Sequence, residues 1–218
     1  LSLKLQGYKD TVKMIRFDGN QDATDGNRNT LSAELGVTRI LTPWSLLHLA
    51  LHHTEQDGFL ATSYNSVFVN NVETSEETPN QRGRDSVTTR YRVALSEQRS
   101  CEFGVRLYKD DWGIGSRTLS VRAFQYLDGR QSILEPHYRF YSQTAADFFQ
   151  KSFTSTPALR TSDPDLGDMT AHMLGLKYTW LQRRFLTLHG DWDLDATFAD
   201  RSNGLNSFWF TLGYRTEY

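Results

Sequence analysis

Histidine and aspartate side chains recur at positions of one parity in two parts of the chain. His189, Asp191 and Asp193 alternate near the C-terminus, and His48 and His52 stand four residues apart in an earlier segment. In a strand, each set would point to one face, because successive side chains face opposite sides. Imidazole and carboxylate groups together can act as a general base with a water-orienting partner, or as ligands of a transition metal.

Ion pairing explains the same aspartates without catalysis. Carboxylates that face arginines on neighbouring strands form salt bridges, and no serine stands in a recognisable nucleophile motif. We therefore expect that the protein is not an enzyme. We place the His and Asp cluster at the strand ends that carry the long connections.

A second group of oxygen ligands lies in a segment rich in Asp, Asn and Gly, spaced as in a calcium loop. Ala23 stands at the sixth position, where such loops carry glycine, and Asn29 replaces the usual glutamate at the twelfth. The segment therefore favours a solvated turn, with a weak Ca²⁺ site as the alternative, and we expect no other cofactor. The candidate ligands are Asp18, Asn20, Asp22 and Asp25.

The elements that would hold all these groups are strands, and the last eleven residues show this most clearly. Phe208, Phe210, Leu212, Tyr214 and Tyr218 share one parity there, whereas most side chains of the other parity are polar. A final strand with alternating aromatic residues is typical of outer-membrane β-barrels, because lipid favours apolar side chains outside the barrel. We assign the C-terminal assembly signal to Phe210, Leu212, Tyr214 and Tyr218.

Nine earlier segments alternate in the same way, and none of their apolar-parity positions is charged. A lysine or arginine that faces lipid at mid-bilayer costs about 2–4 kcal/mol, so lipid explains this pattern. The sequence predicts an all-β, transmembrane, antiparallel up-and-down β-barrel of about ten strands, with residues 1–218 as its single domain. The segments are 1–5, 31–37, 47–51, 87–95, 101–107, 119–123, 134–140, 174–180, 186–194 and 208–218.

The opposite parity of these segments carries charges of both signs. An unpaired buried ion is costlier than a paired one, so we expect an interior filled with ion pairs and closed to free diffusion. The residues that we assign to this network are Glu34, Arg90, Arg92, Glu102, Arg106, Arg122, Glu135, Arg139, Asp191, Asp193 and Arg215.

The connections alternate between short and long. In outer-membrane barrels the short turns are periplasmic and the long loops extracellular, so an even strand count places both termini in the periplasm. Pro136 lies inside a strand, where it removes a hydrogen bond, and we expect a β-bulge there. The short connections are 41–44, 96–99, 128–130 and 181–184; the long ones are 10–27, 56–85, 142–168 and 196–206; and 111–115 is a short exception.

Several motifs in the middle and late chain are specific in their order. They are Tyr-Lys-Asp-Asp-Trp-Gly-Ile at 108–114, Leu-Glu-Pro-His-Tyr-Arg-Phe-Tyr at 134–141 and Ser-Gln-Thr-Ala-Ala-Asp-Phe-Phe at 142–149, with 67–69 and 78–82 before them. They resemble the bacterial family catalogued as Domain of Unknown Function 3570, although Thr144 and Phe149 replace its usual Ser and Tyr. The resemblance implies an outer-membrane β-barrel of a Gram-negative-type bacterium and implies no activity.

The segment 142–149 has a physical interpretation of its own. It leaves a strand with charged inward residues, and its compact turn can fold back over the barrel mouth. We expect Asp147 to meet an inward arginine and Phe148 or Phe149 to pack downward as a plug, with ligand contact as the alternative. The loop residues concerned are Ser142, Gln143, Asp147 and Phe148.

The overall composition argues against some classes of function. The net charge of −2 argues against a nucleic-acid partner, and Cys101, the only cysteine, permits no internal disulfide. Because Leu1 already lies in an alternating segment, we expect an upstream secretion signal that is absent here. We favour a structural scaffold subunit of an envelope assembly in the bacterial outer membrane. Alternatives are a narrow channel for small solutes or ions and, less favoured, a loop-side enzyme or metal/redox partner.

The partners expected for such a scaffold follow from its location. They are outer-membrane lipid and lipopolysaccharide, the barrel assembly machinery during insertion, and other envelope proteins or a periplasmic lipoprotein.

Overall fold

A single ten-stranded antiparallel sheet dominates the computed structural model, which describes residues 1–12, 26–61, 65–185 and 188–216. The sheet order β1-β2-β3-β6-β7-β8-β9-β10-β11-β12 follows the chain, so the predicted up-and-down arrangement of ten strands is confirmed. The strands are β1 (Ser2–Val12), β2 (Gly26–Thr42), β3 (Ser45–Gly58), β6 (Gln81–Ser96), β7 (Arg99–Asp110), β8 (Gly115–Leu127), β9 (Ser132–Gln143), β10 (Met169–Phe185), β11 (Leu188–Arg201) and β12 (Asn206–Arg215).

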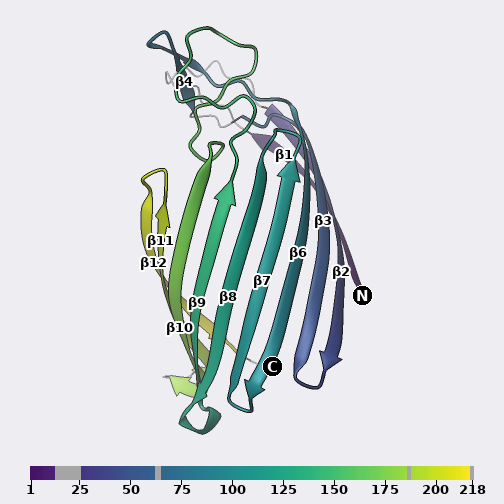
Figure 1. The fold of residues 1–218 in the computed structure, drawn as a ribbon, viewed down its shortest axis with the longest axis vertical. Coiled ribbons are helices and arrows are strands. Elements are labelled where there is room, and N and C mark those ends of the chain that lie inside the picture. Colours follow the sequence, from purple (N-terminus) through teal and green to yellow (C-terminus); the bar gives the residue numbers. More distant parts are fainter. Residues whose placement is uncertain (13–25, 62–64, 186–187, 217–218) are drawn as a thin grey trace.

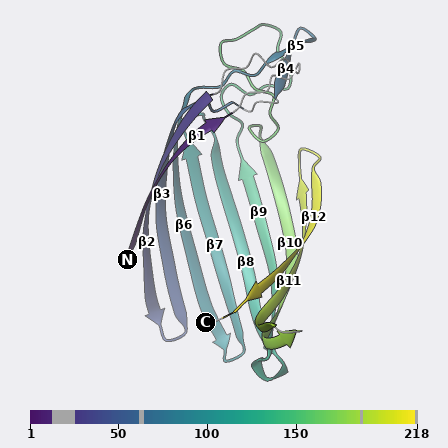
Figure 2. The same cartoon turned by 180° about the vertical axis from the view of Figure 1, so that it is seen from behind.

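The sheet is strongly curved about its long axis. Strands β6–β9 face the viewer in Figure 1, and from behind both edge strands, β1 and β12, lie nearest to the viewer (Figure 2). Within the described residues β1 and β12 are the two edges of the sheet and do not pair with each other. The sheet is thus an open, curved wall, and closure into a barrel is not part of the observed structure.

One face of the sheet is apolar and the other polar, because the pairing keeps side chains of the same kind together except at register shifts near the short-turn end. For example, Leu51 on β3 pairs with Leu35 on β2 and with Val87 on β6. The apolar side chains are exposed, with Leu5 at 68% and Leu212 at 70%. Small residues of the other parity, such as Ala50, Ser86 and Thr197, are buried. Side chains crowd on the inside of a curved sheet, so the polar face is the concave one and the apolar face the convex one.

The two ends of the sheet differ in their connections. Tight turns join β2 to β3 and β6 to β7 at one end, where the 3₁₀ turn η1 (Asp128–Arg130) joins β8 to β9. The other end carries the long segments 59–80 and 144–168. The long loop predicted for 196–206 is wrong: strand alternation continues to Arg201 and leaves only 202–205 as the turn. Both chain ends point toward the short-turn end, because β1 runs away from it and β12 runs back.

The β-bulge expected at Pro136 is wrong. Arg122 pairs with His137 and Gln125 with Leu134, so the register between β8 and β9 is the same on both sides of Pro136. Pairing with β8 lapses only beside the proline, which has no N–H to donate. A register shift occurs instead in β10, between Trp180 and Arg183.

Residues 59–61 and 65–80 pack together with segment 144–168 at the long-connection end, and we call this unit the cap (Figures 1 and 2). Its hairpin consists of β4 (Ser66–Val69) and β5 (Val72–Ser75). Asn70 and Asn71 take positive φ values of 49° and 62° between them, as a tight hairpin turn requires. The second segment joins the hairpin when Phe153 donates its N–H to Phe68 and accepts one from Asn70 at 2.9 Å each.

The cap has a small buried apolar core of its own. Val67 (0% exposed), Val69 and Phe153 (5%) form its core. Arg160 is buried beside them and donates to the backbone oxygens of Ser75 and Pro157 at 3.0 and 2.9 Å. A guanidinium held by backbone acceptors fixes one cap segment to the other. No helix in the described residues is long and apolar enough to cross a membrane.

We predict that Phe153→Ala loosens the cap without unfolding the sheet, because truncating a buried phenylalanine costs about 3–5 kcal/mol. Amide hydrogen exchange should accelerate across 65–77 and 144–168 and stay slow in the sheet strands. Phe68→Ala is the matched control, since Phe68 lies on the same hairpin and is 49% exposed. Equal effects of the two variants would contradict the assignment of the cap core.

Candidate functional site

The concave face carries the charged residues that the sequence assigned to an ion-pair network. Strand register brings Arg92, Glu102 and Arg122 into one row across β6, β7 and β8. Register also places Asp191 opposite Arg215 and Glu34 opposite His52. All these residues have the polar parity, so the structure brings the predicted network to one face.

Few of these neighbouring charged side chains form direct ion pairs. Arg122 Nη1 lies 3.7 Å from Glu135 Oε1, and Asp193 Oδ2 lies 3.2 Å from Lys177 Nζ. Among the described residues, Glu34, Arg90, Glu102 and Arg139 have no carboxylate or cation at ion-pair distance. The filled interior that the sequence predicts is therefore only partly formed by contacts within the sheet.

Two arginines of the network use other contacts. The Arg92 guanidinium lies 4.2 Å from the ring centroid of Phe124, two strands away. Ser100, which pairs with Phe124 on the intervening strand, is small enough for Arg92 to cross. Arg106 donates to Ser86 Oγ at 3.4 Å and lies near the ring of Tyr108. Ring stacking satisfies a guanidinium face and leaves its edge open to a ligand or water.

The His and Asp cluster is at the opposite end from the one predicted. β10 ends at Phe185 at the short-turn end and β11 begins at Leu188, so His189, which pairs with Arg184, lies at that end with Asp191 and Asp193. Asp191 Oδ1 accepts the backbone N–H of Gln182 at 2.8 Å. His48 is also near this end and bonds Thr38 Oγ1 at 2.9 Å. In the described residues no three His, Cys, Asp or Glu side chains converge as metal ligands do.

A buried carboxylate at the capped end is the best-satisfied polar group of the structure. The Asp110 side chain is fully buried, and both Nε and Nη2 of Arg82 donate to its Oδ2. Tyr108 Oη donates to the same oxygen at 2.8 Å. The backbone N–H groups of Trp112 and Ile114 donate to Oδ1 at 3.1 and 2.9 Å. Five donors thus converge on one carboxylate, which we call the Asp110 hub.

Aromatic contacts extend the hub toward the cap. The Arg82 guanidinium stacks on Trp112 at 4.2 Å, and Trp112 Nε1 donates to the Gln81 backbone oxygen at 2.8 Å. Phe148 packs edge-on against Trp112 with the ring centroids 5.3 Å apart. The hub therefore links β6, β7 and the second cap segment.

The other predicted residues of segment 142–149 have different roles. Asp147 is exposed, and no arginine of the described chain is at ion-pair distance from it. Its carboxylate lies over Gly113, where it leaves no room for a Cβ. Gln143 is buried and donates to the Gly167 backbone oxygen at 2.6 Å, which ties the returning cap segment to β9. Ser142 pairs with Thr170 on the convex face. The sequence analysis did not predict that Gln143 joins the cap to β9 or that Asp110 is the centre of the hub. The only signal was the Asp-Asp-Trp-Gly motif at 110–113, which is typical of a turn.

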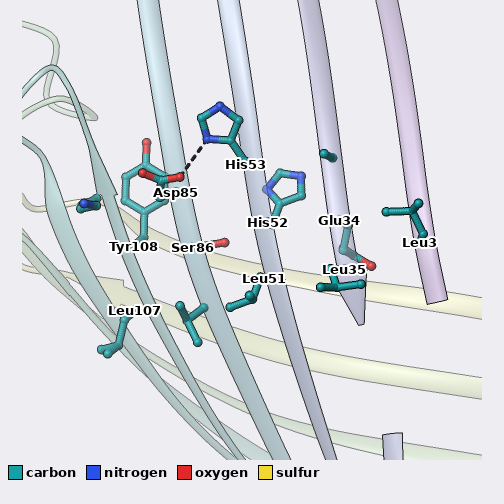
Figure 3. Close-up of a pocket in the computed structure, with 13 residues that line it drawn as sticks. Leu3, Glu34, Leu35, Leu51, His52, His53, Asp85, Ser86, Leu107 and Tyr108 are labelled. Atoms are coloured by element: carbon teal, nitrogen blue, oxygen red, sulfur yellow. Dashed lines mark hydrogen bonds and ion pairs between the residues drawn. The ribbon is translucent and has the colours of Figure 1, made fainter. Parts of the chain in front are cut away.

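The convex face has a groove where its apolar band meets polar residues, near the capped end (Figure 3). The groove has a volume of about 580 Å³. Its apolar side includes Leu35, Leu51 and Leu107 from three strands. At the polar edge His53 Nδ1 lies 2.8 Å from Asp85 Oδ1, as drawn in Figure 3.

The remaining sequence-predicted sites are outside the described residues or lie on the convex face. Asp18, Asn20, Asp22 and Asp25, the candidate calcium ligands, fall in 13–25 and are outside, as is Tyr218. The other members of the predicted C-terminal signal, Phe210, Leu212 and Tyr214, are on the convex face of β12, opposite Ala196, Leu194 and Trp192.

Comparison with known proteins places the chain in a family. The chain belongs to the family described as "Protein of unknown function (DUF3570)", whose model matches residues 4–196. No curated protein matches. A solved structure titled "Bacterial polysaccharide outer membrane secretin" is similar over 97% of this chain and 83% of its own, with 9% sequence identity and a TM-score of 0.38. The family resemblance inferred from the motifs is thereby confirmed.

We predict that Asp110→Asn destabilises the capped end, because it leaves the Arg82 guanidinium buried without its counter-charge. Removing one partner of a buried pair typically costs about 3–5 kcal/mol. Protease sensitivity of 144–168 and urea unfolding of the purified protein measure the loss. Asp147→Asn is the control and should change neither readout; if Asp147→Asn proved as damaging as Asp110→Asn, the hub would be misassigned.

Proposed function

We propose that the protein is an outer-membrane β-barrel that serves as a structural subunit of an envelope assembly and performs no catalysis. The observation that carries this proposal is the apolar convex face, which no other described element covers. Contiguous exposed apolar surface of this extent marks a membrane or protein interaction site. Leu174 at 64% and Phe210 at 65% exposure are representative of it.

The height of the apolar band supports lipid as the neighbour of this face. On β7 the convex positions are uncharged between Arg99 and Lys109, which are ten residues apart. At about 3.3 Å per residue that is roughly 33 Å along the strand, or about 25 Å across a bilayer at a tilt near 40°. Transmembrane barrels have an apolar band of about this height.

Closure of the sheet is the second part of the proposal. In lipid each unpaired backbone group costs several kcal/mol, so open edges are not tolerated there. β1 and β12 run in opposite directions, and both curl to the concave side (Figure 2). Pairing of these edges in an even register would close the wall with the apolar face outside.

The orientation follows the usual arrangement of such barrels. The cap would be extracellular, and the short turns and both chain ends periplasmic. The tied, rigid cap offers a surface to another envelope protein, and the short-turn end one to a periplasmic lipoprotein. The last strand would be read by the barrel assembly machinery. No cofactor is needed for this role, and the Ca²⁺ alternative at 18–25 stays a separate proposal.

A narrow channel is the second candidate function. The unpaired, exposed guanidinium groups of Arg90 and Arg139 on the concave face favour it, because they would attract small anions. In a ten-stranded barrel β11 would stand opposite β6. Asp193 and Asp195 could then approach Arg90 and Arg92 across the lumen and close it, and we favour this closed state.

We predict that Thr89→Lys and Thr88→Lys differ sharply, although the two residues are adjacent. Thr89 lies between Leu49 and Val105 on the convex face, and Thr88 lies between Ala50 and Arg106 on the concave face. In liposomes Thr89→Lys should lose about 2–4 kcal/mol of unfolding free energy, the cost of a lysine facing lipid. Thr88→Lys should lose less than about 1 kcal/mol. Equal losses, or partition of the wild type into water without detergent, would refute the membrane proposal.

We also predict that the purified protein inserted into planar bilayers gives no steady unit currents, as a closed lumen requires. The scaffold proposal would give way to the channel if the wild type passed currents that favour anions and the double variant Arg90→Gln/Arg139→Gln lost that preference.

A further inference from the structure

We propose that the groove at the capped edge of the convex face binds the lipid A anchor of lipopolysaccharide, with an acyl chain in the groove and a phosphate at its polar edge. The inference rests on the proposed function, because it requires the convex face to lie in a bilayer with the cap outside. It adds a defined site and a defined lipid to that function.

The body of the groove suits a hydrocarbon chain. Leu3, Leu35, Leu51 and Leu107 lie along it on four strands, and the leucines of β2, β3 and β7 point to the same side in Figure 3. Ala33 is small where its neighbours along β2 are leucines, which leaves room between them. An acyl chain has no polar atoms to satisfy, so these apolar contacts are sufficient to hold it.

The polar edge of the groove has a cation that its neighbour does not neutralise. Lys109 pairs in register with Asp85. The Asp85 carboxylate instead bonds His53 Nδ1 at 2.8 Å, as Figure 3 shows, and His53 Nε2 lies 3.1 Å from Glu55. Asp85 and Glu55 are therefore engaged with His53, and Asp111, a third carboxylate beside Lys109, accepts the Gly83 backbone N–H at 2.8 Å. The Lys109 ammonium is without an ion-pair partner among the described residues.

A second free cation lies diagonally beside the first. Arg117 on β8 pairs in register with Leu107, two residues from Lys109 on the same face. It is exposed, and in the described chain no carboxylate is at ion-pair distance from it. Guanidinium and ammonium groups are the side chains that hold phosphates in proteins. Charge complementarity thus favours a phosphorylated lipid over a zwitterionic one.

Other occupants fit this groove less well. A peptide that adds as a strand needs a free sheet edge. Strands β2, β3, β6 and β7 are paired on both sides, and β1 would pair with β12 in the proposed barrel. The location of the groove at the cap-side limit of the apolar band brings a bound headgroup to the extracellular leaflet of the proposed orientation. Lipopolysaccharide, which carries phosphates and several acyl chains, is the lipid of that leaflet.

Native mass spectrometry of the full protein in detergent, titrated with lipid A, phosphatidylglycerol or phosphatidylcholine, tests the site. The wild type should retain lipid A in preference to both other lipids. Lys109→Gln combined with Arg117→Gln should lower the retained lipid A at least tenfold at equal lipid. Ala33→Phe, which fills the groove without changing charge, should lower it as well.

Arg39→Gln is the matched control, because Arg39 is an exposed convex cation at the short-turn edge of the band. It should bind lipid A as the wild type does. Equal retention by the double variant, or equal retention of phosphatidylglycerol by the wild type, would overturn the proposal. If the lipid site fails in this way but the wild type partitions into detergent, only the lipid site is refuted and the barrel proposal stands. Partition of the wild type into water would refute the barrel itself.

Discussion

An apolar sheet face without a second layer of protein is the constraint on which the rest of the structure depends. Burying a Leu, Val or Phe side chain contributes roughly 1.5–3 kcal/mol, and a whole domain is stable by only about 5–15 kcal/mol. In the described residues the larger buried apolar side chains, such as Val67, Trp112 and Phe153, are all at the capped end. The sheet itself has no such core, so the proposed account requires an apolar medium on its convex side. The apolar side chains at every second position of the strands are suited to contact with that medium.

The capped end is organised by different interactions. A small apolar core and the Asp110 hub join the first cap segment, the β6–β7 edge and the second cap segment into one unit. The buried carboxylate is stable there because Arg82, Tyr108 and two backbone amides donate to it. A cap tied in this way to one end of the sheet is suited to holding a partner in place, as the proposed structural role requires.

Sequence periodicity was sufficient for the sheet because the side-chain period of a strand is two. It placed ten strands in chain order and assigned each residue to a face. It could not predict contacts that depend on rotamers and register: Arg92 crosses Ser100 to reach Phe124 instead of Glu102. It misjudged Pro136, since a strand can lose one hydrogen bond without gaining a residue. The hub was also missed, because nothing in the spacing of Asp110 shows that the following turn folds back onto it.

The solvent of the convex face can be measured directly with a nitroxide label, because Cys101 is the only cysteine and lies on that face. In liposomes a label on Cys101 should collide readily with oxygen and poorly with a polar nickel complex, as lipid exposure requires. A label on Ser100→Cys in a Cys101→Ser background should show the reverse. Strong collision of the Cys101 label with the nickel complex, equal to that at position 100, would contradict the account.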